Sequence, residues 1–177
     1  MRVNIIGKGK TWVDAPLNEY SWGITQLFLR RSVDLVIDMN VYEDLRWGLQ
    51  EKTEAERVKK RCEDENIPYI GLENYPIKAV MERFETDYFS STLDYAIALA
   101  LYEKYSEINL YGCTMSFSDY GKLKCGCDFW CGYAKGLGAK VIVHGETTVM
   151  KTTDGKVYGY DYPQGGIYAG SGSKFQT

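Results

Sequence analysis

The stretch Tyr88–Gly112, YFSSTLDYAIALALYEKYSEINLYG, decides the fold class of this 177-residue chain. Its segment Ser90–Thr92 contains good helix N-cap residues, and Leu93–Leu101 is apolar almost all round. A helix that is apolar on every side is buried on every side, so we expect this helix to cross the centre of the domain. Ile108–Tyr111 then predicts a short strand that a glycine ends.

Apolar runs and helical segments alternate on both sides of this stretch. Five further runs predict strands, and they are Val3–Ile6, Trp22–Thr25, Asp34–Met39, Pro68–Leu72 and Lys140–Val143. The runs are apolar rather than alternating, and helices separate them, which favours a parallel sheet. We therefore predict an α/β fold: a single Rossmann-like domain with a mostly parallel sheet of about six strands and helices on both faces.

Two more segments predict helices that pack by one face. Glu51–Asn66 is rich in charge and carries a thin apolar stripe of Ala55, Val58 and Cys62, which predicts a surface helix. Asp128–Leu137 has apolar residues at helical spacing, namely Trp130, Tyr133, Ala134 and Leu137. We place the domain at residues 1–158 and expect the Gly/Ser-rich tail, 159–177, to be mobile or draped over the surface.

Composition indicates an acidic globular chain. It has 21 Lys and Arg against 24 Asp and Glu, a formal charge of −3. A non-specific nucleic-acid binder would carry a basic excess, so we expect no nucleic-acid partner. No apolar run approaches the ~18–20 residues that cross a bilayer, and the first residues do not form a signal peptide. We therefore expect a cytoplasmic protein with no membrane partner, and a homo-oligomer stays open.

Polar and glycine residues follow the predicted strands, where open α/β sheets bind ligands. The first group is Gly7-Lys8-Gly9-Lys10-Thr11, whose glycines would let backbone N–H groups approach an anion. It matches neither the full GxGxxG pattern nor a Walker A loop, and a plain tight turn explains it as well.

Three other groups should lie at the same edge of the sheet. Thr25 and Gln26 follow the second strand, and Asp38 and Asn40 follow the third. These side chains could read a base or a sugar, or cap loops. Ser90, Ser91 and Thr92 begin the buried helix, where free N–H groups and hydroxyls suit an anion and also cap the helix.

These segments resemble a known family. GKGKTW, WGITQLF, DMN and above all YFSSTLDYAIALALYEKYSEINLYGCTM are similar to small Rossmann-like proteins of phages and prophages. That set is similar to bacterial sialyltransferases that use a cytidine-monophosphate sugar and to archaeal pterin-pyrophosphokinase-like proteins. The resemblance covers about residues 3–145 and implies a nucleotide or nucleotide-sugar ligand. The positions that match the family's binding segments are Gly7, Gly9, Thr11, Thr25, Gln26, Asn40, Ser90 to Thr92, Ile108, Leu110 and Gly112.

The sequence departs from the family pattern where catalysis would occur. Lys10 replaces a proline, and Thr25 replaces the first residue of an Asn-Gln pair. The sialyltransferases use a histidine base in a segment that matches Trp130–Lys135, where this chain has Tyr133. A tyrosine is almost fully protonated at neutral pH. His144, the single histidine, ends the last strand and is the other candidate base.

Five cysteines, an odd number, favour free thiols or ligands over a disulfide framework. The spacing of Cys125, Cys127 and Cys131 is not that of a usual zinc knuckle, so we assign no metal ligand, although the sequence leaves a metal at these residues and Cys113 open. We predict a phage-type protein that binds a nucleotide or nucleotide-sugar-like ligand and sequesters or modifies it. A glycosyltransferase-like enzyme and a non-catalytic interaction module are the alternatives.

Overall fold

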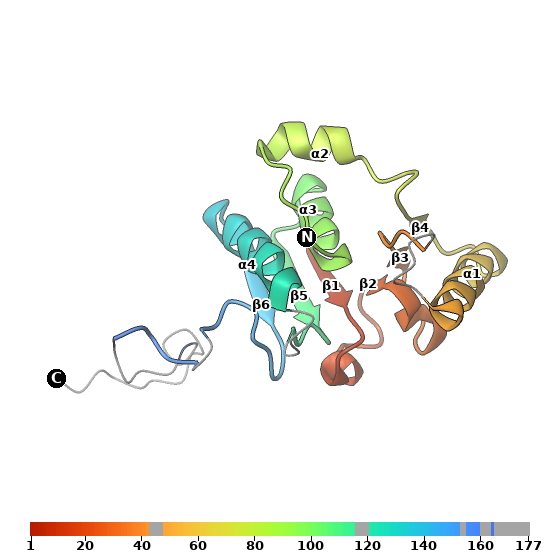
Figure 1. Cartoon of the computed structure of the whole chain (residues 1–177), viewed down its shortest axis with the longest axis horizontal. Helices are drawn as coiled ribbons and strands as arrows, with labels where there is room; N and C mark the ends of the chain where they lie inside the picture. The colour runs from red at the N-terminus through yellow and green to blue at the C-terminus, as the bar shows by residue number, and fades with distance from the viewer. Residues whose placement is uncertain (43–47, 116–120, 153–154, 160–163, 165–177) are drawn as a thin grey trace.

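The sheet of this protein is parallel throughout. The computed structural model describes residues 1–42, 48–115, 121–152, 155–159 and 164, with the backbone alone at 121 and 122. Its six strands pair in the order β4-β3-β2-β1-β5-β6 (Figure 1). Their bounds are β1 Arg2–Ile6, β2 Ser21–Ile24, β3 Leu35–Ile37, β4 Tyr69–Ile70, β5 Glu107–Tyr111 and β6 Lys140–Val143. The predicted α/β, Rossmann-like fold is confirmed.

Four helices cover the two faces of the sheet unequally. Their bounds are α1 Leu49–Asp64, α2 Ile77–Phe84, α3 Thr92–Tyr102 and α4 Gly121–Gly136. The helices α3 and α4 lie side by side over the centre of the sheet with α2 outside them, while α1 lies at the β3–β4 end (Figure 1). Val36 packs against Val58 of α1, whereas its neighbours on β3 belong to the core beneath α3, so α1 is on the opposite face. Over the rest of that face lie two short 3-10 helices, η1 Lys10–Asp14 and η2 Thr25–Leu29.

The helix α3 is buried as its composition predicts. Its residues from Thr92 to Ala100 are buried except Tyr95, which is half-buried. They pack in one core with Val3 and Ile5 of β1 and with α4. The stripe of α1 is also confirmed, because Ala55, Val58 and Cys62 are its buried residues. None of the helices in the described residues has the length and apolar character needed to cross a membrane.

Two helices differ from the sequence prediction. The helix α2 was not predicted, although Ile77, Val80 and Phe84 stand at helical spacing, because its eight residues are shorter than the window over which periodicity was read. The helix α4 begins seven residues earlier than predicted. Its buried face is shifted toward the N-terminus from the predicted one, since Leu137 is 58% exposed. The buried face consists of Cys127, Trp130, Cys131 and Ala134, which keep the same helical spacing.

The chain reverses direction across the sheet between β1 and β5. From β1 it steps outward to β4 on one side, and it then returns to β5 on the other side of β1. This is a topological switch point, where open α/β sheets bind ligands at the carboxyl ends of the strands. The loops after β1 and β5 meet here, because Gly9 N donates to Gly112 O at 2.8 Å.

Candidate functional site

A cavity of about 590 Å³ lies at this switch point. Segments that follow β1, β2, β3 and β5 line it together with the start of α3, as the predicted convergence of strand ends requires. The lining residues are Gly7, Lys8, Gly9, Ile24, Thr25, Met39, Asn40, Phe89, Ser90, Ser91, Thr92, Leu93, Tyr95, Gly112, Cys113, Thr114, Met115 and Leu123.

Nine of the thirteen predicted ligand-binding residues line this switch-point pocket. They are Gly7, Lys8, Gly9, Thr25, Asn40, Ser90, Ser91, Thr92 and Gly112. The other four, Lys10, Thr11, Gln26 and Asp38, do not line it, and neither do the predicted catalytic residues Tyr133 and His144. The structure therefore brings together the segments that the sequence singled out, but neither candidate base lines the same pocket.

The glycine loop after β1 is shaped by close packing of backbones. Gly7 N donates to Tyr111 O and Gly9 N donates to Gly112 O, both at 2.8 Å. The sequence predicted that these two N–H groups would approach an anion, but both are used in these backbone hydrogen bonds. A Cβ on Gly7 or Gly9 would lie 2.7 Å from Gly112 O. A side chain at either glycine would therefore distort the loop, and these contacts fit the tight-turn interpretation of the two glycines.

The start of α3 is closed by its own carboxylate. Asp94 Oδ2 accepts from Ser90 N at 2.7 Å, Ser90 Oγ at 2.8 Å and Ser91 N at 3.0 Å. Its Oδ1 accepts from Ser91 Oγ at 2.8 Å, and Ser91 caps the helix in a capping box. Burial raises the pKa of this fully buried carboxyl group, although these donors oppose the rise. Both serine hydroxyls therefore serve the cap.

Two N–H groups of this helix start remain for a ligand. In the part of the chain that the structure describes, the N–H groups of Thr92 and Leu93 donate to no protein acceptor, and both residues line the pocket. Unsatisfied N–H groups at a helix N-terminus attract anions. The anion site that the sequence predicts at this helix is thereby reduced to these two donors.

A hydrogen-bonded network joins the ends of β1, β2 and β3. Lys8 Nζ donates to Gln26 Oε1 at 2.9 Å, and Gln26 Nε2 donates to Tyr42 Oη at 3.1 Å. Tyr42 Oη donates to Asp38 Oδ2 at 2.8 Å. Asn40 Nδ2 donates to Asp38 Oδ1 at 2.7 Å and to Tyr42 Oη at 3.2 Å. Gln26 and Asp38 thus support the pocket-lining Lys8 and Asn40 from behind.

The two ionisable groups Asp38 and Lys8 in this network each favour the charged form of the other, against the effect of desolvation. Burial raises the pKa of the Asp38 carboxyl group, while its bonds from Tyr42 and Asn40 and the charge of Lys8 oppose the rise. Desolvation lowers the pKa of the Lys8 ammonium group, and Asp38 opposes this change. Among the lining residues that the structure describes, Lys8 is the one cationic side chain, so the pocket suits an anion of low charge.

Thr25 is strained and incompletely paired. Its φ of 53° lies in the left-handed region, which β-branched residues rarely adopt. Its Oγ1 is buried and has no hydrogen-bond partner among the residues that the structure describes. Leaving a buried hydroxyl unpaired costs roughly 1–3 kcal/mol. Backbone strain and an unpaired polar group at one pocket residue are both features that gather at ligand sites.

The lining also has a large apolar part, which the sequence interpretation missed. The Phe89 ring stacks on Tyr95 with centroids 4.3 Å apart and on Trp130 with centroids 5.0 Å apart. Phe89 comes directly before Ser90 and Ser91, so its place in the sequence could have predicted that it lies at the same site. The apolar and aromatic lining residues are Ile24, Met39, Phe89, Leu93, Tyr95, Met115 and Leu123.

The remaining predicted residues have structural contacts elsewhere. His144 Nε2 bonds Asn109 Oδ1 at 2.9 Å, and its ring stacks on Tyr111 at 4.0 Å. Thr11 Oγ1 accepts from the N–H of Gly112 at 2.9 Å, which ties η1 to the end of β5. Tyr133 Oη donates to the backbone oxygen of Phe84 at 3.0 Å. Lys10 is exposed at the start of η1.

All five cysteines lie among the described residues, and none of them forms a disulfide. Cys113, Cys127 and Cys131 are buried, and Cys125 is exposed. Burial raises the pKa of the pocket-lining Cys113 to about 12. Among the described residues, no group of three or more His, Cys, Asp or Glu side chains is arranged to hold a metal ion.

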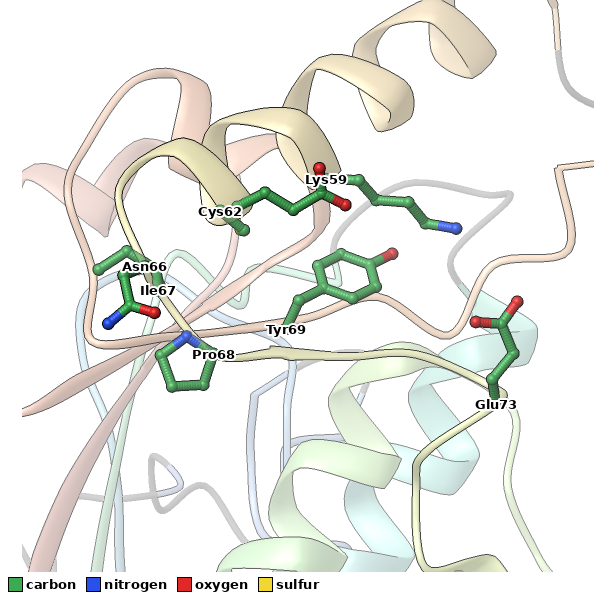
Figure 2. Close-up of a pocket in the computed structure, with 8 residues that line it drawn as sticks. Lys59, Cys62, Asn66, Ile67, Pro68, Tyr69 and Glu73 are labelled. Atoms are coloured by element: carbon green, nitrogen blue, oxygen red, sulfur yellow. The ribbon is translucent and has the colours of Figure 1, made fainter.

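A second cavity, of about 510 Å³, lies between α1 and the edge strand β4 (Figure 2). We call it the edge cavity; its lining residues are Lys59, Cys62, Glu63, Asn66, Ile67, Pro68, Tyr69 and Glu73. The Tyr69 ring lies below α1 with Lys59 Nζ 5.6 Å from its centroid.

Comparison with known proteins gives a distant structural likeness. No protein-family model and no curated protein matches the sequence. The sialyltransferase CstII from Campylobacter jejuni, in complex with the substrate analogue cytidine-5'-monophosphate, is 15% identical, with 80% of this chain and 78% of that chain covered and a TM-score of 0.34. CST-II in complex with a trisaccharide acceptor and CMP is 13% identical, with 81% and 80% covered and a TM-score of 0.39. The phage origin stays a prediction.

Proposed function

We propose that this protein binds a nucleotide or nucleotide-sugar-like ligand in the switch-point pocket. The observation that carries the proposal is the presence of both polar donors and apolar residues in the lining of one cavity. The polar part offers Lys8 and the N–H groups of Thr92 and Leu93, which have no acceptor among the described residues and suit a phosphate. The apolar part is aromatic and aliphatic, which suits a base or another flat group.

The same pocket favours binding over glycosyl transfer. Among its described lining residues the ionisable side chains are Lys8, Tyr95 and Cys113. Burial raises the pKa of Tyr95 and of Cys113, so neither accepts a proton readily near neutral pH. Both candidate bases from the sequence lie outside the pocket. Sequestration of the ligand therefore fits this geometry better than a reaction that needs a general base.

Titration calorimetry with cytidine, uridine and adenosine monophosphates and a cytidine-monophosphate sugar tests the proposal. Lys8→Met should weaken the affinity by about 10–100-fold, because a charge-assisted hydrogen bond to phosphate contributes roughly 1.5–3 kcal/mol. Lys10→Met is the matched control, since Lys10 is two residues away and does not line the pocket. No binding by any of these ligands, or equal loss in both variants, would reject the proposal.

A further inference from the structure

The side-chain amide of Asn40 is held in one orientation. Both hydrogens of its Nδ2 are used, because Nδ2 donates to Asp38 Oδ1 and to Tyr42 Oη. Asn40 N also donates to Asp38 Oδ1, at 3.2 Å. In the described part of the chain no donor reaches Asn40 Oδ1, and Asn40 lines the pocket.

The chemistry of the partners fixes which end of the amide faces them. An ionised carboxylate accepts hydrogen bonds and cannot donate them. The Tyr42 hydroxyl has a single hydrogen, which it gives to Asp38 Oδ2 at 2.8 Å, so toward Asn40 it can only accept. If the amide turned over, the Asn40 oxygen would face two acceptors. The amide nitrogen must therefore face Asp38 and Tyr42.

The group that imposes this orientation is itself rigidly placed. Asp38 is 2% exposed, and its N–H donates to Ile70 O at 2.9 Å across the β3–β4 ladder. Tyr42 Oη also accepts from Gln26 Nε2, and the oxygen of the same amide, Oε1, accepts from Lys8 Nζ. The orientation of Asn40 is thus set by the ends of three strands.

We propose that Asp38 is a positioning residue that makes the pocket select ligands with a hydrogen-bond donor opposite Asn40. The inference rests on the proposed ligand site and adds a rule of specificity to it. Locked in this way, Asn40 presents only its carbonyl oxygen, so it accepts from a hydroxyl or amino group and repels a carbonyl oxygen. Lys8 lines the pocket and belongs to the same hydrogen-bonded network as Asn40. The expected ligand therefore carries an anionic group for Lys8 and a hydrogen-bond donor for Asn40 on one side.

Matched ligand pairs test this rule. Cytidine and uridine monophosphates differ by an amino group against a carbonyl oxygen, and uridine and 2'-deoxyuridine monophosphates differ by one hydroxyl. We expect wild-type protein to prefer the donor-bearing member of one pair by roughly tenfold, since a lost hydrogen bond with an unpaired partner costs about 1.4 kcal/mol. Asp38→Asn, in which residue 38 can also donate, should reduce the preference to below roughly threefold because the Asn40 amide can then turn over.

Two further variants keep the result interpretable. Asp34→Asn is the matched control, because Asp34 precedes β3 at its other end, where it accepts from Ser21 N at 2.7 Å. Tyr42→Phe removes one of the two locking groups and keeps the ring, in case Asp38→Asn fails to fold. An equal preference in wild-type and Asp38→Asn proteins, or the same loss in Asp34→Asn, would overturn the rule.

A measurement without ligand separates this rule from the proposed function. In nitrogen-15 NMR spectra the two side-chain amide hydrogens of Asn40 should exchange slowly with water in the wild type and quickly in Asp38→Asn and Tyr42→Phe. Fast exchange in the wild type would refute the lock even if nucleotides bind. Slow exchange without any nucleotide binding would support the lock and reject the proposed ligand class.

Discussion

The switch-point pocket and the edge cavity have similar volumes but differ in how their polar groups are paired. The first, about 590 Å³, is lined by Thr25, whose buried Oγ1 has no partner among the described residues. The second, about 510 Å³, contains none of the unpaired buried side-chain atoms of the described residues. Polar groups left without partners persist where a ligand or water completes them. The comparison teaches that pairing, and not volume, separates a candidate site from a gap between elements.

Beside the edge cavity, backbone groups of the edge strand β4 and of the turns next to it have hydrogen-bond partners within the chain. Asn74 acts as a substitute for a further strand, because its Oδ1 accepts from Gly71 N and its Nδ2 donates to Tyr69 O, both at 2.8 Å. The turn before β4 is closed by Ile67 N, which donates to Cys62 O at 2.8 Å. Such closure protects an edge strand from pairing with another chain.

The largest expected effect is on the close packing between the loops that follow β1 and β5 at the switch-point pocket. Gly112→Ala should lower the free energy of unfolding by about 2–4 kcal/mol, from left-handed strain and backbone overlap. Gly112 has a φ of 63°, and its Cβ would lie 2.5 Å from Gly7 O. Gly132→Ala on α4 is the control, because a Cβ there meets nothing within 4 Å, and it should be neutral or stabilising. Urea unfolding measures the free energy of unfolding of both variants, and equal values would show that the packing between these loops tolerates a side chain.

The next effect concerns Asp94 and depends on pH. Asp94→Asn should cost about 1–3 kcal/mol, because the carboxylate accepts bonds from both serines of the helix start. Burial raises the folded-state pKa of Asp94, so the wild type gains stability as pH falls through that value toward the usual 3.8. The cost of the variant should therefore grow on acidification. Urea unfolding of the wild type and Asp94→Asn at pH values from 7.5 down to 4.5 measures this cost. A cost that shrinks toward pH 4.5 would contradict the prediction.

Thr25→Val should change stability and binding in opposite directions. Replacing an unpaired buried hydroxyl with a methyl group of similar size should raise the unfolding free energy of the free protein by about 1 kcal/mol. The same change should weaken the affinity for the best nucleotide by roughly threefold to tenfold. Thr53→Val, on the exposed face of α1, should leave affinity unchanged. Calorimetry that finds full affinity in Thr25→Val would remove this hydroxyl from the site.

The smallest effect is expected in the edge cavity. Lys59→Met removes a cation from above the Tyr69 ring and should cost about 0.5 kcal/mol, the contribution of an exposed cation–π contact. Nucleotide affinity should not change. A loss of affinity comparable to that of Lys8→Met would contradict the distinction between the two cavities.

Which segments form the site could be predicted from the sequence, but which atoms serve it could not. The residues after β1, β2 and β3 and the start of α3 were identified because parallel strands place their carboxyl ends at one edge. Gln26 and Asp38 were predicted to contact ligand, yet they bond Lys8 and Asn40. Those bonds join separate strand ends, and no local pattern specifies them.

The sequence by itself determined the α/β class, the buried α3 and the positions of the strands, because these depend on hydrophobic periodicity and capping within short windows. Only the tertiary structure decided that the N–H groups of Gly7 and Gly9 donate to the backbone oxygens of Tyr111 and Gly112 and that His144 stacks on Tyr111 away from the pocket. These outcomes depend on which groups distant in the chain come within hydrogen-bond distance, and that is fixed by packing of the whole sheet.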